Sequence, residues 1–309
     1  MIDLTRRTLN TSLAAALVSA LIPKLALASA AEGSRVIKHR MGTTDITGNP
    51  ARVVALEFSF VQALDALGVV PAGIADDNQP KRIEQLLGKQ IAYGSVGTRL
   101  EPNLELVSAL VPDLIIADEA RHSAVYAQLS AIAPTIVLNS WEGDYQTIKD
   151  SVLTISDALG VKTKGDQVLS THDATIASLK ANIPAGEKRR FLLAVATPDS
   201  MSLHTSASFT GSVFKAMGLT PAVEASVAVE SGASLERLIA VNPDVMLVAT
   251  DDAGTVLEQW KDNSAFANIS AVKHGTIFQV DRNQFSRFRG LKTAELIARE
   301  ILAKVYHAG

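Results

Sequence analysis

The chain has 309 residues, 47% of them hydrophobic, and a formal net charge of −3. This length accommodates two domains that each bury a core of their own, and the slight acidity argues against nucleic acid or an anionic membrane surface as the main partner. Because the sequence contains no cysteine, we expect neither a disulfide nor a lipid anchor attached through a cysteine.

The first 30 residues have the pattern of an export signal. Arg6 and Arg7 precede an apolar run over 13–22, and Ala28 and Ala30 fit a cleavage site. The apolar run is shorter than a membrane-spanning helix requires. The arginine pair is similar to a twin-arginine signal, although Sec signals also contain such pairs. Cleavage would leave 26 basic and 31 acidic side chains, and we expect a soluble periplasmic protein.

Strand-like apolar runs alternate with helical segments in both halves of the mature chain. Strands are expected at 52–56, 72–75, 114–117 and 135–138, and again at 191–196, 201–204, 245–249 and 277–280. Helices in the first half are expected at 61–67, 83–87, 104–110 and 124–132. The alternation is typical of parallel sheets covered on both faces, and it predicts an α/β protein with two lobes.

The middle of the chain has a helical pattern instead. Apolar residues at helical spacing predict a helix over 145–159, ended by Gly160, and another over 164–183, ended by Pro184. The second would be about 30 Å long at 1.5 Å per residue. It lacks the composition of a flexible linker, so we expect a rigid connection. The predicted domains are 31–162, the connecting helix 163–184 and 185–309.

One stretch of sequence occurs twice. The segment 104–118 has a near-copy at 235–250, in which a Leu-Glu pair opens an amphipathic run and a Pro-Asp pair precedes a strand. Glu105 and Glu236 take the same place in the two copies. Each falls in the first turn of a helix, where the helix dipole favours an acidic side chain.

Arginines follow several of the predicted strands. Arg99, Arg121 and the pair Arg287 and Arg289 leave strand ends or adjoining loops, which is where open α/β sheets bind small molecules. Guanidinium groups bind carboxylates bidentately, so the pattern predicts an anionic ligand. Alternatively, Arg99 and Arg121 are solvated loop residues, and one of Arg287 and Arg289 pairs with an acid.

Three other residues are candidates for the same site. His122 follows Arg121, although a hydrogen-bonded structural histidine fits it as well. Ser206 belongs to a hydroxyl-rich loop that either bonds ligand oxygens or caps a helix, and Phe285 either walls the crevice or packs in the core. The six histidines are scattered, so we expect no direct metal coordination.

Five segments together resemble the class III periplasmic solute-binding proteins of iron-chelate ABC importers, and among these the ferric dicitrate-binding proteins. The resemblance covers essentially the whole mature chain, and its segments are RVVALEFSFVQALDALGVVPAGIADDN (52–78), SVGTRLEPNLE (95–105), PDLIIADEARH (112–122), LHTSASFTGSVFKAMGL (203–219) and RNQFSRFRG (282–290). It implies two Rossmann-like lobes joined by one long helix, a monomer without a cofactor, and capture of an anionic Fe(III) chelate between the lobes.

The resemblance also implies a partner. Glu105 and Glu236 match the glutamates that dock such proteins onto an inner-membrane ABC permease dimer. The segment TPDS (197–200) departs from the pattern, since ferric citrate proteins place an arginine there. A hydroxamate or other siderophore is therefore an alternative ligand. An exported two-lobe enzyme is the alternative from another class, but the chain lacks the G-x-G-x-x-G, Walker A and G-x-S-x-G motifs.

Overall fold

A computed structural model describes residues 33–251 and 254–306, and the predicted export signal lies outside this range. The described chain begins with an antiparallel hairpin of β1 (Ser34–His39) and β2 (Gly42–Thr47). Thr44 Oγ1 donates to Thr135 O at 2.7 Å and joins the hairpin to the first sheet. No apolar run indicated this hairpin, because Ile37 and Ile46 are its only buried residues.

The first sheet is parallel throughout, with the strand order β5-β4-β3-β6-β7. Its strands are β3 (Val53–Ala55), β4 (Gly73–Ile74), β5 (Gly94–Ser95), β6 (Leu114–Asp118) and β7 (Thr135–Leu138). The helices between them are α1 (Phe58–Ala66), α2 (Pro80–Leu87), α3 (Leu104–Ala109), α4 (Glu119–His122) and α5 (Tyr126–Ile132). The four strands and four helices predicted for this half are confirmed, while β5 and α4 were not predicted.

The second sheet has the order β11-β9-β8-β12-β13, with β10 also paired to β8. The strands β8, β10, β12 and β13 are parallel, whereas β9 is antiparallel to β8 and β11 to β9. The strands are β8 (Arg190–Ala196), β9 (Met201–His204), β10 (Thr220–Pro221), β11 (Val229–Glu230), β12 (Val245–Thr250) and β13 (Ile277–Asp281). The four strands predicted here are confirmed.

Five α-helices accompany the second sheet in the described chain: α8 (Phe209–Ala216), α9 (Leu235–Val241), α10 (Leu257–Trp260), α11 (Ser270–Lys273) and α12 (Leu291–Tyr306). A π-helical turn at Asn283–Arg287 precedes α12. We call the first sheet with α1–α6 the first lobe, and the second sheet with α8–α12 the second lobe. The predicted fold of two α/β lobes with mainly parallel sheets is confirmed.

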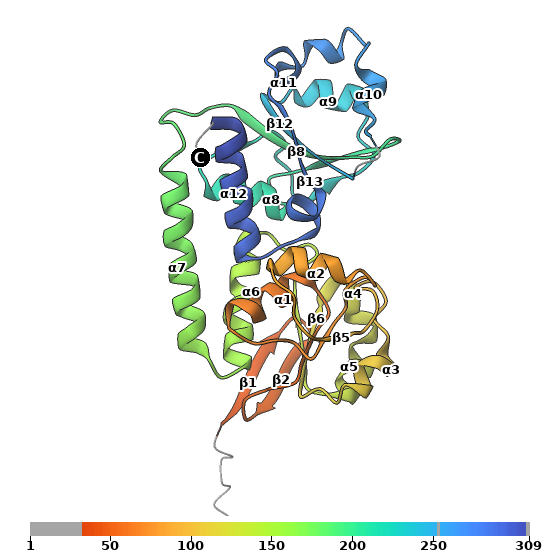
Figure 1. Ribbon diagram of the computed structural model, residues 1–309, viewed down its shortest axis with the longest axis vertical. Helices are drawn as coiled ribbons and strands as arrows, with labels where there is room; N and C mark the ends of the chain where they lie inside the picture. Colours follow the sequence, from red (N-terminus) through yellow and green to blue (C-terminus); the bar gives the residue numbers. More distant parts are fainter. Residues whose placement is uncertain (1–32, 252–253, 307–309) are drawn as a thin grey trace, which may run out of the picture. The chain divides into compact units, whose positions relative to one another are not determined.

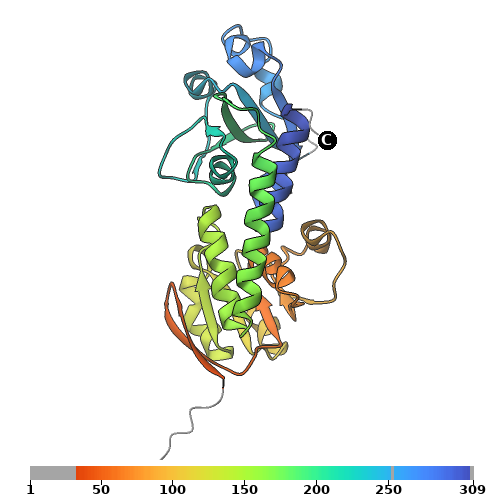
Figure 2. The same ribbon diagram turned by 90° about the vertical axis from the view of Figure 1, so that its left-hand side faces the viewer.

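Two successive helices lie between the two sheets, and the second of them connects the lobes. The first, α6 (Tyr145–Ala158), ends before Gly160, whose φ of 73° suits a glycine. The second, α7 (Lys162–Lys180), has 19 residues and is therefore about 28 Å long. It packs against α6 and α12, as the two ribbon views show (Figures 1 and 2). His172 on α7 bonds Tyr145 OH at 2.5 Å and Glu295 Oε1 at 2.6 Å, so the connection is a packed helix.

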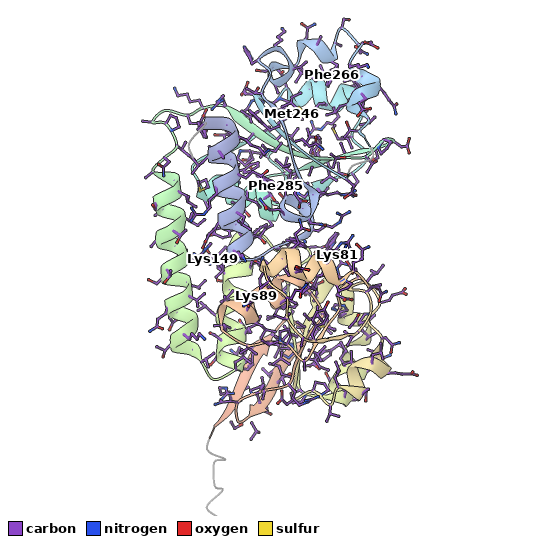
Figure 3. The ribbon with its side chains drawn as sticks, in the orientation of Figure 1. Lys81, Lys89, Lys149, Met246, Phe266 and Phe285 are labelled. Carbon is purple, nitrogen blue, oxygen red and sulfur yellow. The ribbon has the colours of Figure 1, made fainter. Side chains whose placement is uncertain are left out.

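Both faces of each sheet are covered by apolar side chains, because successive residues of a strand point to opposite faces. In the second sheet, Met246 packs with Phe266 on one face, and Leu247 packs with Phe285 on the other (Figure 3). No helix within residues 33–251 and 254–306 is long and apolar enough to cross a membrane.

The sequence repeat builds the same unit in each lobe, α3 with β6 in the first and α9 with β12 in the second. The aspartate of each Pro-Asp pair accepts backbone N–H groups at the start of the neighbouring strand. Asp113 accepts from Arg52 N at 2.9 Å, and Asp244 accepts from Arg190 N at 2.8 Å. Each aspartate therefore fixes its strand against β3 or β8.

The side chains of the same two arginines, Arg52 and Arg190, bind the ends of the repeat helices. Arg52 Nε donates to Leu110 O at 3.0 Å, and Arg190 donates to Asn242 O. Both acceptors lie at the end of a repeat helix, where carbonyl groups lack helical partners. We call each set of contacts, between aspartate, strand, arginine and helix end, the helix–strand clasp.

The residue before the proline is left-handed in both clasps, with φ of 46° at Val111 and 44° at Asn242. Asparagine tolerates this conformation, whereas a β-branched valine does not. We expect Val111→Asn to raise the free energy of unfolding by about 1 kcal/mol. Asn242→Val should lower it by more than that, because Asn242 Oδ1 also accepts from Ser270 N at 2.7 Å. Urea denaturation measures both changes. Equal stability of the wild type and both variants would contradict this account of the strain.

Candidate functional site

Charged side chains gather at the carboxyl ends of the strands in the first sheet. Glu57 follows β3, Asp77 follows β4, Arg99 follows β5, and Asp118 ends β6. Because the strands are parallel, these ends lie along one edge of the sheet. Residues that are far apart in the sequence therefore meet there.

The centre of the group is a buried carboxylate. The Glu57 side chain is only 1% exposed. Its Oε2 accepts a hydrogen bond from Arg99 Nη1 at 3.2 Å, and its Oε1 lies 2.8 Å from Arg121 Nε. The second contact is an ion pair without hydrogen-bond alignment, since neither atom has a hydrogen-bond partner. Burial raises the pKa of Glu57, and the charges of Arg99 and Arg121 oppose that rise.

Arg99 is 6% exposed and so is not a solvated loop residue. Its Nη2 donates to Asp77 Oδ2 at 2.8 Å, and its guanidinium carbon lies 3.8 Å from the centroid of the Phe58 ring. Burial favours a higher pKa for Asp77, but the hydrogen bonds from Arg99 outweigh it and lower that pKa. Arg99 is thus fixed on three sides before any ligand is present.

His122 fits the structural alternative given for it, a hydrogen-bonded histidine inside the protein. The side chain is fully buried. Its Nδ1 accepts from Asp118 N at 2.9 Å, and its Nε2 lies 2.8 Å from Arg99 O, where it donates. Both ring nitrogens are therefore used inside the protein, and His122 holds the Arg99 loop in place.

Two other predicted arginines meet at Trp141, in the loop after β7. The guanidinium carbon of Arg121 lies 4.1 Å from the indole centroid, and that of Arg289 lies 5.0 Å from it. Asp118 Oδ2 accepts from Trp141 N at 2.9 Å and so positions this loop. Cation–π attraction partly offsets the repulsion between the two like charges. Arg99, Arg121 and Arg289 therefore belong to one cluster, which includes Glu57.

Arg289 comes from the second half of the chain but is anchored in the first lobe. Its neighbours Phe288 and Leu291 pack in the core of the first lobe, and the Phe288 ring lies 5.6 Å from Phe58. The side chain makes a single long hydrogen bond, from Nη1 to Arg287 O at 3.5 Å. Burial, together with repulsion by Arg99, lowers the pKa of Arg289 to about 10. The group is therefore charged at neutral pH and lacks a close anionic partner in the described chain.

Arg287 takes a different position. Its Nη1 lies 3.1 Å from Asp251 Oδ1 and donates to Asn283 Oδ1 at 2.9 Å. Of the two arginines, Arg289 joins the cluster and Arg287 pairs with an acid, which is the alternative that the spacing left open.

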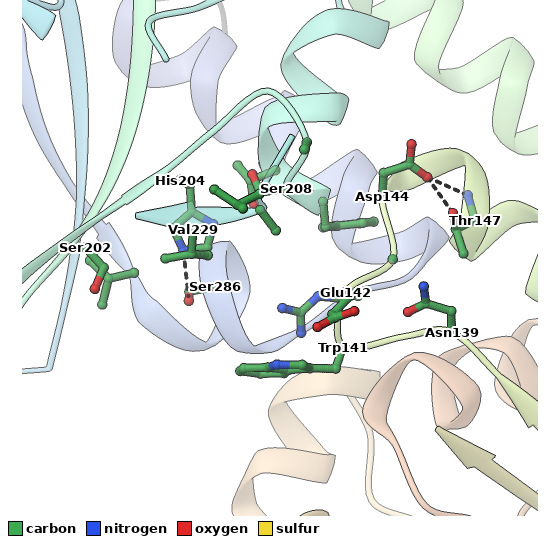
Figure 4. Close-up of a pocket in the computed structure, with 18 of the residues that line it drawn as sticks. Asn139, Trp141, Glu142, Asp144, Thr147, Ser202, His204, Ser208, Val229 and Ser286 are labelled. Atoms are coloured by element: carbon green, nitrogen blue, oxygen red, sulfur yellow. Dashed lines mark hydrogen bonds between the residues drawn. The ribbon is translucent and has the colours of Figure 1, made fainter. Parts of the chain in front are cut away.

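A cavity of about 870 Å³ adjoins the cluster, within the range of small-molecule sites. From the first lobe, Asn139, Trp141 and Glu142 face it, and from the second lobe, His204 and Ser286 (Figure 4). The remaining polar residues of its wall are Asp144, Thr147, Ser202, Ser208, Thr210, Ser226, Ser231, Arg282 and Arg289. The second lobe therefore contributes mainly hydroxyl groups together with Arg282, while Arg289 is the other arginine of the wall.

Two further residues predicted to contact a ligand lie inside the protein. Phe285 is fully buried in the core of the second lobe, where its carbonyl accepts from Thr210 Oγ1 at 2.6 Å. Ser206 is 6% exposed, and its hydroxyl accepts from Ala225 N at 3.4 Å. Neither side chain lines the cavity, whereas Ser208 of the same loop does.

Trp141 and His204 are among the cavity-lining residues that were not predicted from the sequence. A lone aromatic residue in the loop after a strand gave a weak signal for Trp141. His204 ends β9, and its Nε2 lies 3.4 Å from Ser286 Oγ. Burial and the charge of Arg289 lower the pKa of His204 to about 3, so the imidazole is neutral. Among the described residues, no three His, Cys, Asp or Glu side chains are grouped as metal ligands.

Glu105 and Glu236 lie away from this cluster, in the first turns of α3 and α9. Asn103 caps α3 and Ser234 caps α9, and both glutamate side chains are exposed. The Ser234 hydroxyl lowers the pKa of Glu236. In the part of the chain that the structure describes, neither carboxylate takes part in an ion pair.

Comparison with known proteins gives consistent matches. Residues 53–283 match the family model described as periplasmic binding protein. The Fe(3+)-citrate-binding protein YfmC of Bacillus subtilis is 45% identical over 279 residues, which cover 90% of this chain and 88% of that protein. The Fe(3+) dicitrate-binding periplasmic protein FecB of Escherichia coli is 36% identical over 273 residues, 88% of this chain and 90% of FecB. Staphylococcus aureus SirA complexed with staphyloferrin B superposes with a TM-score of 0.77 at 25% identity, covering 88% of this chain and 98% of SirA.

The central carboxylate can be tested by substitution. Glu57→Gln leaves Arg99 and Arg121 without their shared anion, and breaking a buried ion pair costs about 3–5 kcal/mol. We expect that loss in the free energy of unfolding, measured with urea. The control Glu230→Gln removes a carboxylate paired with Arg237 at 2.8 Å on the surface and should cost less than about 1 kcal/mol. Equal losses in the two variants would show that Glu57 does not hold the cluster together.

Proposed function

The chain belongs to the periplasmic binding protein family and is a solute-binding protein rather than an enzyme, and on this premise we propose that it captures an anionic Fe(III) chelate of the ferric citrate type. The chelate would occupy the cavity beside Trp141 and pass to the permease of an ABC importer. Its iron arrives already coordinated by the chelator. The protein therefore needs to recognise the outer surface of the complex and to supply no ligand atoms of its own.

The observation that supports this proposal is the excess of positive over negative charge in the cluster. Arg121 and Arg289 both contact Trp141, whose ring lines the cavity, and Arg289 has almost no partner within the protein. The whole chain is acidic, with a net charge of −3, whereas two guanidinium groups meet at this indole ring. Ferric citrate complexes expose carboxylates, which guanidinium groups bind as charge-assisted pairs.

Another siderophore is the second candidate ligand. The exit of β8 forms a turn in which Thr197 N donates to Ser200 O at 2.9 Å, and residues 197–200 contain no basic side chain. One cation expected for ferric citrate is therefore missing. The hydroxyl groups of the second lobe suit the oxygen atoms of a larger chelate, and SirA is a structural neighbour seen with staphyloferrin B.

The predicted location and assembly extend the same proposal. Residues 1–30 would direct export, by the twin-arginine or the Sec route, and be removed. The mature chain would then act in the periplasm as a soluble monomer with lobes at 31–162 and 185–309. The helix 163–184 would limit their relative motion.

Ligand binding can be followed by tryptophan fluorescence. Trp141 lines the cavity, whereas Trp260 packs near Phe266 in the second lobe, with ring centroids 6.3 Å apart. In a Trp260→Phe background, ferric citrate should quench the fluorescence of Trp141. Adding Arg289→Gln should weaken the affinity on the order of tenfold or more, because a charged hydrogen bond is lost. The Arg189→Gln variant removes an arginine paired with Glu187 instead and serves as the control.

The quenching experiment separates the two candidate ligands. Ferric citrate and a panel of ferric siderophores are titrated separately into the same protein. If a ferric siderophore binds tightly and ferric citrate does not, the siderophore becomes the proposed ligand. No quenching by any ferric chelate, with the fold intact by circular dichroism, would overturn the transport function.

We further propose that Glu105 and Glu236 dock the loaded protein onto the permease dimer. The two clasps hold α3 and α9 alike against their sheets, so each lobe presents its carboxylate from an equivalent place. Two equivalent anions suit two equivalent cationic pockets, and such pairs set orientation and encounter rate more than affinity.

Charge reversal at both positions tests this docking. Glu105→Lys combined with Glu236→Lys should abolish iron uptake in cells while the affinity for the chelate stays within about twofold of the wild type, because neither residue adjoins the cavity. The control reverses two exposed acids elsewhere, Asp166→Lys with Asp262→Lys, and should transport normally. A collapse of chelate affinity in the first variant, or full transport by it, would contradict docking by these glutamates.

A further inference from the structure

The two repeat helices differ in the side chains that surround their glutamate. In the first copy of the repeat, Leu106 follows Glu105, and the chain leaves the helix before Val111. In the second copy, the positions that match these two apolar residues hold Arg237 and Asn242. The same backbone unit therefore carries apolar residues in one lobe and polar residues in the other.

The apolar residues of the first copy are open to solvent. Leu106 is 46% exposed and Val111 is 71% exposed. Leu106 lies one helical turn before the half-buried Leu110, and residues four apart in a helix are neighbours on its surface. Val111 follows Leu110 directly. We call the row of Leu106, Leu110 and Val111, which begins beside Glu105, the apolar strip.

A valine is unfavourable for folding at position 111. The φ of Val111 is 46°, which a β-branched residue adopts only with strain. The exposed side chain gains little packing in return, whereas Asn242 adopts the same conformation in the second copy without that strain. Backbone strain of this kind is concentrated at functional sites. A contact with a partner therefore accounts for the valine better than a role in the fold does.

The second copy is polar in the same region. Arg237 Nε lies 2.8 Å from Glu230 Oε2, and both side chains are partly exposed. Burying this ion pair in an interface would remove water from two charges, and the attraction between them offsets that loss only in part. Asn242 Oδ1 is occupied by Ser270 N, from which it accepts at 2.7 Å. The region around Glu236 therefore suits a contact that keeps its water.

The charge of Glu105 restricts what can cover the apolar strip. In a symmetric dimer of this protein, the same patch of both subunits would meet, and the two Glu105 carboxylates would come close together. An anionic membrane surface would also repel this carboxylate. A protein surface that presents a cation among apolar side chains matches both the charge and the strip.

We propose that the two lobes dock unequally, the first through the apolar strip together with Glu105 and the second through the charge of Glu236 alone. The permease surface that faces the first lobe would then have a cation set among apolar side chains, and it would bury Leu106 and Val111. The surface that faces the second lobe would be polar. This inference rests on the docking proposed above and goes beyond it, because it gives each lobe a different complementary surface.

The two kinds of contact have different effects on docking. Charge pairs mainly accelerate the encounter, and their strength falls as salt increases. Burial of apolar surface requires close contact, so it acts once the two proteins have met. The strip should therefore slow dissociation. Because only the first lobe carries it, the strip should also determine which way round the protein sits on the permease dimer.

The test uses the permease dimer on which iron uptake depends, reconstituted in nanodiscs of phosphatidylcholine, and measures binding by surface plasmon resonance in the presence of ferric citrate. Leu106→Gln and Val111→Asn should each weaken binding on the order of tenfold, because each removes an apolar side chain from the interface. The loss should come mainly from faster dissociation and should be equal at low and high salt. Val111→Asn should also unfold at a higher urea concentration than the wild type, so its weaker docking would not result from a damaged fold.

Two matched substitutions serve as controls. Leu296→Gln and Val70→Asn make the same chemical changes at residues of other elements that are 36% and 55% exposed, and both should bind the permease like the wild type. Binding by Leu106→Gln and Val111→Asn within about twofold of these controls would overturn the unequal docking. A loss that disappears at high salt would overturn it as well, since the lost contact would then be one of charge.

Failure of the proposed docking is recognised separately. Glu105→Gln combined with Glu236→Gln should weaken binding to the permease and reduce its salt dependence. If this variant binds more weakly while the two apolar variants bind like their controls, docking by the glutamates stands and the apolar strip is overturned. No binding of the wild type to the permease would overturn the docking itself, and the strip with it.

The two other occupants are examined with the same variants. The wild type should sediment as a monomer and should not bind vesicles of phosphatidylglycerol. A dimer, or binding to these vesicles, that is lost in Leu106→Gln and Val111→Asn would assign the apolar strip to a second copy or to the membrane and would overturn the proposal.

Discussion

The site depends on one buried carboxylate that holds positive charges together. Without Glu57, Arg99 and Arg121 would face each other in a medium of low polarity, where like charges repel strongly. With Glu57 between them, the two guanidinium groups can stay close together while the cavity is empty. Asp77, Asp118 and His122 then fix the backbone and side chains around this contact. Much of the edge of the first sheet therefore holds the cationic side chains in place. Little further ordering of these side chains is needed when a ligand binds.

The two lobes contribute different groups to the site, because Arg289 is anchored in the first lobe. Its sequence position belongs to the second lobe, but Phe288 and Leu291 insert it into the core of the first. The buried Gln62 makes the same connection, since its Nε2 donates to Thr293 Oγ1 at 2.8 Å. The cations of the cluster therefore move with one lobe. The other lobe contributes Arg282, serine hydroxyls and the neutral imidazole of His204 to the cavity wall.

The regular part of the fold could be predicted from the sequence because buried parallel strands are continuous apolar runs. The runs at 114–117 and 245–249 are examples, and the helices between such runs follow from periodicity. The hairpin at 34–47 could not be found in this way, because most of its side chains are exposed. Likewise β5 has only two residues, too few to form a pattern. In these elements the backbone pairing decides the structure, and the composition does not.

The site was predictable where its chemistry required a charged side chain at a strand end, as for Arg99, Arg121 and Arg289. It was not predictable where the assignment depended on contacts across the chain. Phe285 and Ser206 point into the protein because of how the π-helical turn and the loop before α8 pack. The position of Trp141 depends on Asp118, which is 23 residues earlier.

The incomplete pairing of Arg289 has a practical consequence for anyone who purifies this protein. A nearly unpartnered guanidinium next to an open cavity attracts whatever anion is abundant, so phosphate, sulfate or citrate from a buffer competes for the same place. An affinity measured in such a buffer reflects the difference between the binding of the ligand and the binding of the buffer anion. Its value therefore depends on which buffer anion is present. If the proposed function holds, the same competition operates in the cell, where a chelate has to displace simpler anions as well as water.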